Sequence, residues 1–212
     1  IAALNGGFFD PNNQQTTSHV IRAGEVLADP ARNSRLTGNS DLESYLDAIL
    51  NRSEFRRYDC DGDRRYDIAF HSDPVPEGCS LRDALGGGPQ LLPERTDDIE
   101  AFVAYADGQK IRDALGSDRP NARTAIGITA SGDLLWVVAA QTPAFAPQSG
   151  ASFANLAELM RDLGAVRALN LDGGSSASMT YGDELYLGRL DSQNRAIERP
   201  VKSVLLLQKE VE

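Results

Sequence analysis

The chain has 212 residues, 41% of them hydrophobic and 25% charged, and its formal net charge at pH 7 is −10. This length suits a single globular domain over residues 1–212, whose core needs neither a metal nor several disulfides. The acidic balance makes nucleic acid and anionic membranes poor candidate partners, and no apolar run approaches the roughly 20 residues of a membrane span. The composition leaves the oligomeric state open.

Short strands, turns and one helix are predicted for the first half of the chain. Residues 1–4 form a buried strand, and residues 20–22 and 25–28 pair as a hairpin around Gly24. Ser40 is expected to cap a helix over residues 41–50, with Glu43 completing a capping box. Most of residues 52–78 is polar and irregular apart from a strand signal at 66–70, so the region around 30–79 is interpreted as an elaborated insertion. A short helix is expected over residues 97–105.

The second half of the chain has a more regular pattern. Residues 124–129 and 134–140 are β-rich runs joined by a hairpin turn, and further strands are expected at 166–171 and 201–207. Residues 152–163 form an amphipathic helix that Gly164 ends. Strands interspersed with few helices predict an α+β fold, with a mixed, mainly antiparallel sheet and a few packed helices.

The two cysteines, Cys60 and Cys79, bear on the cellular compartment. A disulfide between them would close a surface loop and stabilise the fold by about 3 kcal/mol in the loop-entropy model. A disulfide would indicate a secreted, periplasmic or otherwise extracytoplasmic protein. Two free thiols are the alternative.

Four segments place glycines or small residues beside a polar group at the end of an apolar run, which is typical of sites built on rigid strands. They are Asn5-Gly6-Gly7-Phe8-Phe9-Asp10, Gly86-Gly87-Gly88-Pro89, Arg123-Thr124 and Asn170-Leu171-Asp172-Gly173-Gly174-Ser175-Ser176. Each also has a structural interpretation alone, as a turn, a tight bend or a solvent-facing arginine. Arg199, just before the last strand, offers a second cation.

In this order the segments resemble the phosphodiester glycosidase family. The resemblance rests on NGGFFD at residues 5–10, GGGPQLL at 86–92, ARTAIGIT at 122–129, NLDGGSSASM at 170–179 and RPVKSVLLL at 199–207. It implies hydrolysis of the bond between a sugar anomeric carbon and a phosphodiester, in envelope polymers or glycoconjugates. No cofactor is required for that reaction.

This chemistry assigns roles to the candidate residues. Asp172 is the first choice for the carboxylate that the oxocarbenium-like sugar needs, and Asp10 is the second. Arg123, Arg199 and the amides of Gly86, Gly87 and Gly88 are expected to bind the phosphate. The remaining predicted substrate-binding residues are Asn5, Thr124, Asn170, Gly173, Gly174 and Ser175.

Two other functions stay open. One is a non-catalytic phosphoglycan- or carbohydrate-binding module. The other is an amidase or esterase that uses Ser175 as nucleophile, although Ser178 stands where the second glycine of a Gly-x-Ser-x-Gly elbow would be. His19 and His71 lie away from every motif and are not expected to be catalytic.

A separate acidic stretch resembles a calcium loop. Asp59, Asp61, Asp63 and Asp67 fall at loop positions one, three, five and nine, but Arg64 replaces the required glycine and Phe70 the bidentate glutamate. A standard EF-hand is excluded. A looser structural calcium site and a solvated acidic loop are the two remaining interpretations.

Overall fold

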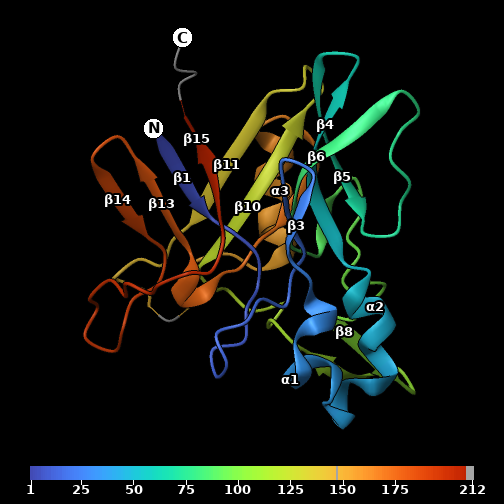
Figure 1. Ribbon diagram of the computed structural model, residues 1–212. Helices are drawn as coiled ribbons and strands as arrows, with labels where there is room; N and C mark the ends of the chain where they lie inside the picture. The colour runs from blue at the N-terminus through green and yellow to red at the C-terminus, as the bar shows by residue number, and fades with distance from the viewer. Residues whose placement is uncertain (147, 209–212) are drawn as a thin grey trace.

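The computed structural model describes residues 1–146 and 148–208, so residues 147 and 209–212 of the predicted domain lie outside the described part. Its strands form three larger sheets and one small hairpin (Figure 1). The strands are β1 (Ala2–Asn5), β2 (Val20–Arg22), β3 (Glu25–Ala28), β4 (Ser53–Cys60), β5 (Asp63–Phe70), β6 (Cys79–Gly86), β7 (Gln90–Leu92), β8 (Val103–Ala106), β9 (Gln109–Asp113), β10 (Arg123–Thr129), β11 (Leu134–Ala139), β12 (Ala165–Asn170), β13 (Ser178–Tyr181), β14 (Glu184–Leu187) and β15 (Val204–Leu207). The helices are α1 (Ser34–Thr37), α2 (Leu46–Leu50) and α3 (Phe153–Asp162), with 3-10 turns η1 (Pro30–Arg32), η2 (Ser40–Tyr45) and η3 (Gly174–Ser176).

The sheet β11-β10-β12-β7 lies at the centre, with helix α3 on one of its faces. Ser152, predicted as the first residue of this helix, is its cap and accepts a hydrogen bond from the Asn155 N–H. The apolar side of α3 packs against small side chains of β10 and β12, among them Ala125 and Ala168. Small residues there let the helix approach the sheet closely.

The other face of this central sheet carries the larger side chains of the same strands. Ile126 of β10 and Leu169 of β12 alternate with the alanines that face α3. They form one core with Leu4 of β1, Phe55 of β4 and residues of the sheet β3-β2-β6-β4-β5. The central sheet therefore has α3 on one side and the two other large sheets on the opposite side.

Two predictions about the first half were wrong in detail. The helix expected over residues 41–50 is instead the 3-10 turn η2 followed by α2, and its cap is Asn39, not Ser40, because Asn39 Oδ1 accepts from the Asp41 N–H. Residues 97–105 form a turn that leads into β8, not a helix, since the Phe102 and Val103 N–H groups both donate to the Asp97 carbonyl.

The segment around residues 30–79, predicted as an insertion, is largely ordered. Its strands β4 and β5 form a long hairpin, and β4 also pairs with β6, so the segment is part of a five-stranded sheet. The predicted disulfide is present between Cys60 and Cys79, which are register partners at the end of β4 and the start of β6.

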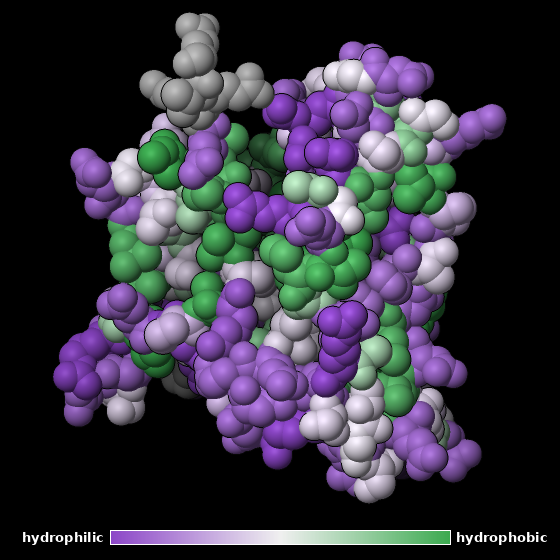
Figure 2. All heavy atoms as spheres, viewed as in Figure 1, coloured by the Kyte–Doolittle hydropathy of each residue, from purple (hydrophilic) through white to green (hydrophobic). Residues whose placement is uncertain are grey.

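The fold class is confirmed in its main feature, because every strand pair in the described residues is antiparallel and sheets outweigh helices. Hydrophobic residues also reach the surface: Val26 and Leu27 of the β2–β3 hairpin and Leu185 of β14 are more than half exposed, and green patches over β3 and β14 are visible in Figure 2. None of the described helices is long and apolar enough to cross a membrane.

Candidate functional site

Four strand ends meet at one place. Strands β1 and β12 end there, and β10 and β15 begin there, because β12 runs antiparallel to β10 and β1 antiparallel to β15. The chain leaves β12 as the turn that contains Asp172, and the Asp172 N–H donates to the Gly6 carbonyl just after β1. The first, third and fourth predicted segments are thereby brought together, with Arg199 arriving ahead of β15.

Asn5 is the connecting side chain of this junction. Its amide Nδ2 donates to the Asp172 carbonyl at 2.6 Å, while its Oδ1 accepts from Thr124 Oγ1 at 2.7 Å and from the Ser178 N–H at 3.0 Å. Both Asn5 and Thr124 are buried. Because both side chains are buried and hydrogen-bonded within the protein, Asn5 and Thr124 hold the Asp172 turn in place and do not face solvent.

The Asp172 carboxyl group lies in a mostly buried position. Burial raises its pKa to about 6, against the opposing effects of the Ser176 hydroxyl, the Gly173 N–H and the Arg199 charge. The Gly173 N–H donates to Asp172 Oδ1 at 2.9 Å. The Ser176 Oγ, also buried, has no hydrogen bond of normal geometry. A carboxyl group with a pKa near neutrality can gain or lose a proton at physiological pH, as catalytic acids and bases do.

A cation lies beside this carboxyl. Arg199 Nη1 donates to Ser175 Oγ at 3.0 Å, and its guanidinium carbon lies 4.8 Å from the centre of the Phe9 ring. A second arginine, which the sequence did not suggest, is close to the same turn: a Cβ atom at Gly174 would lie 3.3 Å from Arg189 Nη1. Gly174 also has a φ of +59°, which favours glycine.

A cavity of about 190 Å³ opens at the Asp172 turn. It is lined by Phe8, Ala114, Leu115, Asn121, Arg123, Asn170, Leu171, Asp172, Gly173 and Gly174. Asn170 Nδ2 donates to the Gly88 carbonyl at 2.8 Å, and its buried Oδ1 has no partner. Buried polar atoms are seldom left unpaired, and this oxygen is one of three such side-chain atoms in the described residues.

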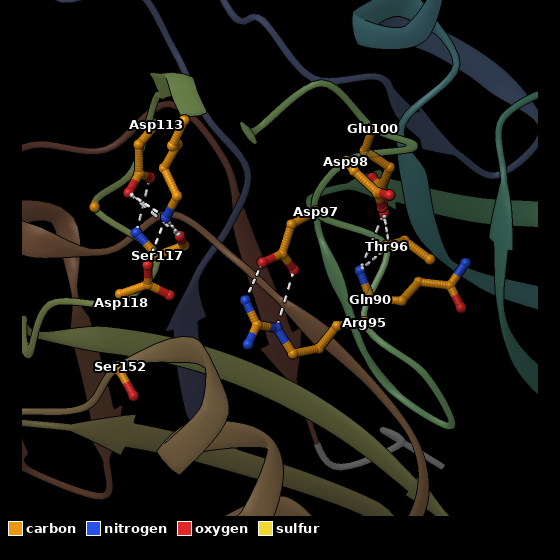
Figure 3. Close-up of polar contacts among 12 residues, drawn as sticks. Gln90, Arg95, Thr96, Asp97, Asp98, Glu100, Asp113, Ser117, Asp118 and Ser152 are labelled. Atoms are coloured by element: carbon orange, nitrogen blue, oxygen red, sulfur yellow. Dashed lines mark hydrogen bonds and ion pairs between the residues drawn. The ribbon is translucent and has the colours of Figure 1, made fainter. Parts of the chain in front are cut away.

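The Gly86–Gly88 amides do not form the predicted anion site. Their N–H groups donate to the carbonyls of His19, Ser53 and Asn170 respectively, each at 2.8 Å. The glycines are needed for close approach, since a Cβ at Gly87 would lie 2.7 Å from the Asn170 oxygen. The buried Glu100 carboxyl lies next to this bend, and burial raises its pKa. It accepts hydrogen bonds from Gln90 and Thr96 (Figure 3), and also from the Ser53 N–H.

Arg123 also differs from the prediction of a phosphate ligand. Its guanidinium is buried and donates to the carbonyls of Leu115, Gly116, Arg119 and Ala151 at 2.8 to 3.2 Å. It therefore anchors the loop at 115–119, which Asp113 also holds by accepting from the Ser117 N–H at 2.8 Å (Figure 3). Four of its five N–H groups are already used.

Asp10 is not brought to Asp172 by any described contact. Its carboxylate accepts from the Asn12 N–H at 2.8 Å and pairs with Arg35 at 2.7 Å. The Asn12 N–H and the Arg35 guanidinium lower its pKa. Asp10 is an ionised turn residue in this arrangement, so Asp172 is left as the better catalytic candidate.

Comparison with known proteins assigns the chain to a family. A family model described as phosphodiester glycosidase matches residues 1–208. The chain belongs to the phosphodiester glycosidase family. A search of curated proteins found no match.

One solved structure supports the fold of this family member. The catalytic domain of zebrafish N-acetylglucosamine-1-phosphodiester alpha-N-acetylglucosaminidase, auto-inhibited by its pro-peptide, is 21% identical with a TM-score of 0.67, over 99% of this chain and 63% of that chain. The chain thus spans less than two thirds of that protein's length. A hypothetical protein from Synechocystis is 17% identical with a TM-score of 0.48, over 87% of this chain and 48% of that chain.

The acidic stretch of this glycosidase-family chain is a β-hairpin. Asp61 and Gly62, both with positive φ, form the turn between β4 and β5, and Asp59 accepts from the Gly62 N–H at 3.0 Å. Asp67 lies farther along β5 and pairs with Arg167. The four carboxylates do not form a ligand cluster in the described part of the chain. Structural calcium stays a prediction, and this geometry does not favour it.

Proposed function

We propose that this protein is a hydrolase that cleaves the bond between a sugar anomeric carbon and a phosphodiester oxygen. The observation that carries the proposal is the Asp172 carboxyl group. Asp172 lines the cavity, burial raises its pKa to about 6, and the positive charge of Arg199 opposes that rise. Hydrolysis at an anomeric carbon needs a carboxylate beside developing positive charge. A phosphodiester leaving group needs a cation beside developing negative charge.

The two groups divide this chemistry between them. Asp172, as carboxylate, stabilises the oxocarbenium-like sugar, as nucleophile or as base for the attacking water. Arg199 replaces Arg123 in the role of phosphate ligand, because its described contacts are one hydroxyl and one ring. Arg189 is a further candidate cation for the phosphate. Asn170 Oδ1 accepts a hydrogen bond from a sugar hydroxyl or amide group.

The substrate we propose is a sugar-1-phosphodiester of an envelope polymer or glycoconjugate, with N-acetylglucosamine as one candidate sugar. The likeness to the zebrafish enzyme, which acts on an N-acetylglucosamine-1-phosphodiester by its name, supports this substrate class. We also propose a secreted or other extracytoplasmic location. The Cys60–Cys79 disulfide supports it, because disulfides persist in oxidising compartments.

The Ser175 hydrolase is the second candidate, and the contacts of Ser175 weigh against it. A serine nucleophile needs a base within hydrogen-bond reach. The described partner of Ser175 Oγ is Arg199, which donates to it, and neither histidine contacts it.

The test is release of free sugar from a sugar-1-phosphodiester, measured for the wild type and Asp172→Asn. The wild type should release sugar, and the isosteric variant should lose at least about 10³-fold in kcat, as expected when a catalytic carboxylate is removed. Near-wild-type turnover by Asp172→Asn would refute the assignment of Asp172 as the catalytic carboxylate. Sugar binding without release by the wild type would favour the binding module.

Matched variants separate the remaining roles. Asp10→Asn removes the second-choice carboxylate and should keep most of the activity, because Asp10 pairs with Arg35. Arg199→Gln should lose about 10²–10³-fold in kcat, the usual cost of one well-placed donor. Ser175→Ala should keep activity within about tenfold, and the wild type should resist labelling by a fluorophosphonate.

A further inference from the structure

A cluster of three ligand-type side chains lies outside the proposed active site. It consists of His19, just ahead of β2, Glu54 of β4 and His71, just after β5. One ligand atom from each lies within 4.8 Å of the others, and no other such group occurs among the residues that the structure describes. Two histidines from distant segments, both outside every predicted motif, meet at one buried carboxylate.

Hydrogen bonds orient each member of the cluster. His19 Nε2 lies 3.1 Å from the Leu50 carbonyl. A carbonyl only accepts, so Nε2 carries the proton and Nδ1 carries a free lone pair. Glu54 is 0% exposed, and its Oε2 accepts from Arg56 Nε at 2.9 Å, which leaves Oε1 toward His71 Nδ1 at 2.5 Å. Metal-binding histidines are commonly held in this way by a carbonyl on the other ring nitrogen.

We infer that His19, Glu54 and His71 form a binding site for a zinc ion. Two imidazoles and one carboxylate are a common zinc donor set that leaves the fourth position to water. The two rings are stacked face to face, 2° from parallel with centroids 3.5 Å apart, and imidazole lone pairs lie in the ring plane. For both lone pairs to point at one ion, the His71 ring must turn out of the stack and its Nδ1 must move away from Glu54 Oε1, which now lies at 2.5 Å.

The surroundings of His71 allow that movement. The His71 side chain is 39% exposed, so it can rotate and its open side admits water and the ion. The zinc ion takes the place of the proton that lies between His71 Nδ1 and Glu54.

The position of this zinc site gives it a structural role. The His19 carbonyl accepts from the Gly86 N–H, and the next two glycines contact Ser53 and Asn170. An ion that ties His19 to β4 and β5 would therefore stabilise the bend that supports Asn170 at the cavity. This inference does not depend on the proposed hydrolase activity.

The experiment uses tag-free, chelator-treated protein titrated with zinc. Because the chain has two histidines only, NMR of the imidazole nitrogens reports both ligands without ambiguity. Calorimetry should give one site, both imidazoles should shift together, and zinc should raise the melting temperature. His19→Gln and His71→Gln should each weaken binding by more than about 100-fold, since each loses a direct ligand. The control, Asp59→Asn with Asp63→Asn, should bind as the wild type does.

Three outcomes would overturn the inference. They are no saturable zinc binding by the wild type, imidazole signals that stay unchanged at saturation, and loss of binding in the acidic-hairpin control while both histidine variants bind normally. The wild-type titration decides the matter even if a variant fails to fold, and circular dichroism checks each variant. Sugar release plays no part in the readout, so failure here leaves the proposed hydrolase untouched.

Discussion

Replacing Asp172 by asparagine should stabilise the fold at neutral pH. Burial raises the carboxyl pKa from 3.8 to about 6. Between these values the folded protein retains a proton that the unfolded chain releases, so the free energy of unfolding falls as pH rises through this window. Two pKa units correspond to about 3 kcal/mol, an upper value because the turn is partly exposed. Asparagine never ionises, so the variant avoids this cost at pH 7 and shows no advantage below about pH 4.

Denaturant titrations of the wild type and Asp172→Asn at about pH 4 and pH 7.5 measure this difference. Asp10→Asn is a control with the opposite sign. The Asp10 pKa is lowered, so its ionised form stabilises the fold, and the variant should lose stability at neutral pH and not in acid. An Asp172→Asn variant that has the same stability difference from the wild type at both pH values would refute the buried, high-pKa carboxyl. A neutral-pH loss would refute it as well.

Two more predictions concern the site. Sugar release should fall as pH drops through about 6, because protonation removes the Asp172 carboxylate. Arg199→Gln should move this acid limb to higher pH, since the Arg199 charge lowers the Asp172 pKa. A rate that does not change as pH drops through about 6 would contradict the role of the Asp172 carboxylate. Arg123→Met should lower the free energy of unfolding by at least about 3 kcal/mol, because four carbonyls lose their donor, while KM changes little. Denaturation and kinetics of the same variant check this, and a large KM increase in a stable variant would restore Arg123 as a phosphate ligand.

Local patterns predicted the longest helix and the more apolar strands, but they missed β4, β8, β9, β13 and β14. Helix α3 has a cap, an apolar side and a terminating glycine, all within one segment of the chain. The helix expected at 41–50 failed in part because a 3-10 turn, capped by Asn39, occupies its first half. The β4–β5 hairpin was missed over most of its length because its polar, charged residues lack the alternation that marks a half-buried strand.

The convergence of the predicted segments was anticipated better than the contacts that their residues make. Strand ends with glycines and polar groups did converge at Asn5, Thr124 and the Asp172 turn. The glycine amides at 86–88 were assigned to an anion, yet tertiary partners far along the chain accept their hydrogen bonds. The partner of a backbone N–H depends on the fold, so no local pattern could have assigned it. The same holds for His19 and His71, which only the sheet β3-β2-β6-β4-β5 brings together.

The two arginines at the site show why residue type alone does not identify an anion ligand. Arg123 and Arg199 both precede or begin a strand, and either could pair with a phosphate in principle. Burial lowers the pKa of Arg123 to about 10, and main-chain carbonyls hold it in place; breaking those bonds to reach a phosphate would leave buried acceptors unpaired. Arg199 contacts the Ser175 hydroxyl and the Phe9 ring, and an arriving phosphate can replace the hydroxyl at little cost while the ring contact persists. We therefore propose Arg199, the arginine with the weaker partners, as the phosphate ligand.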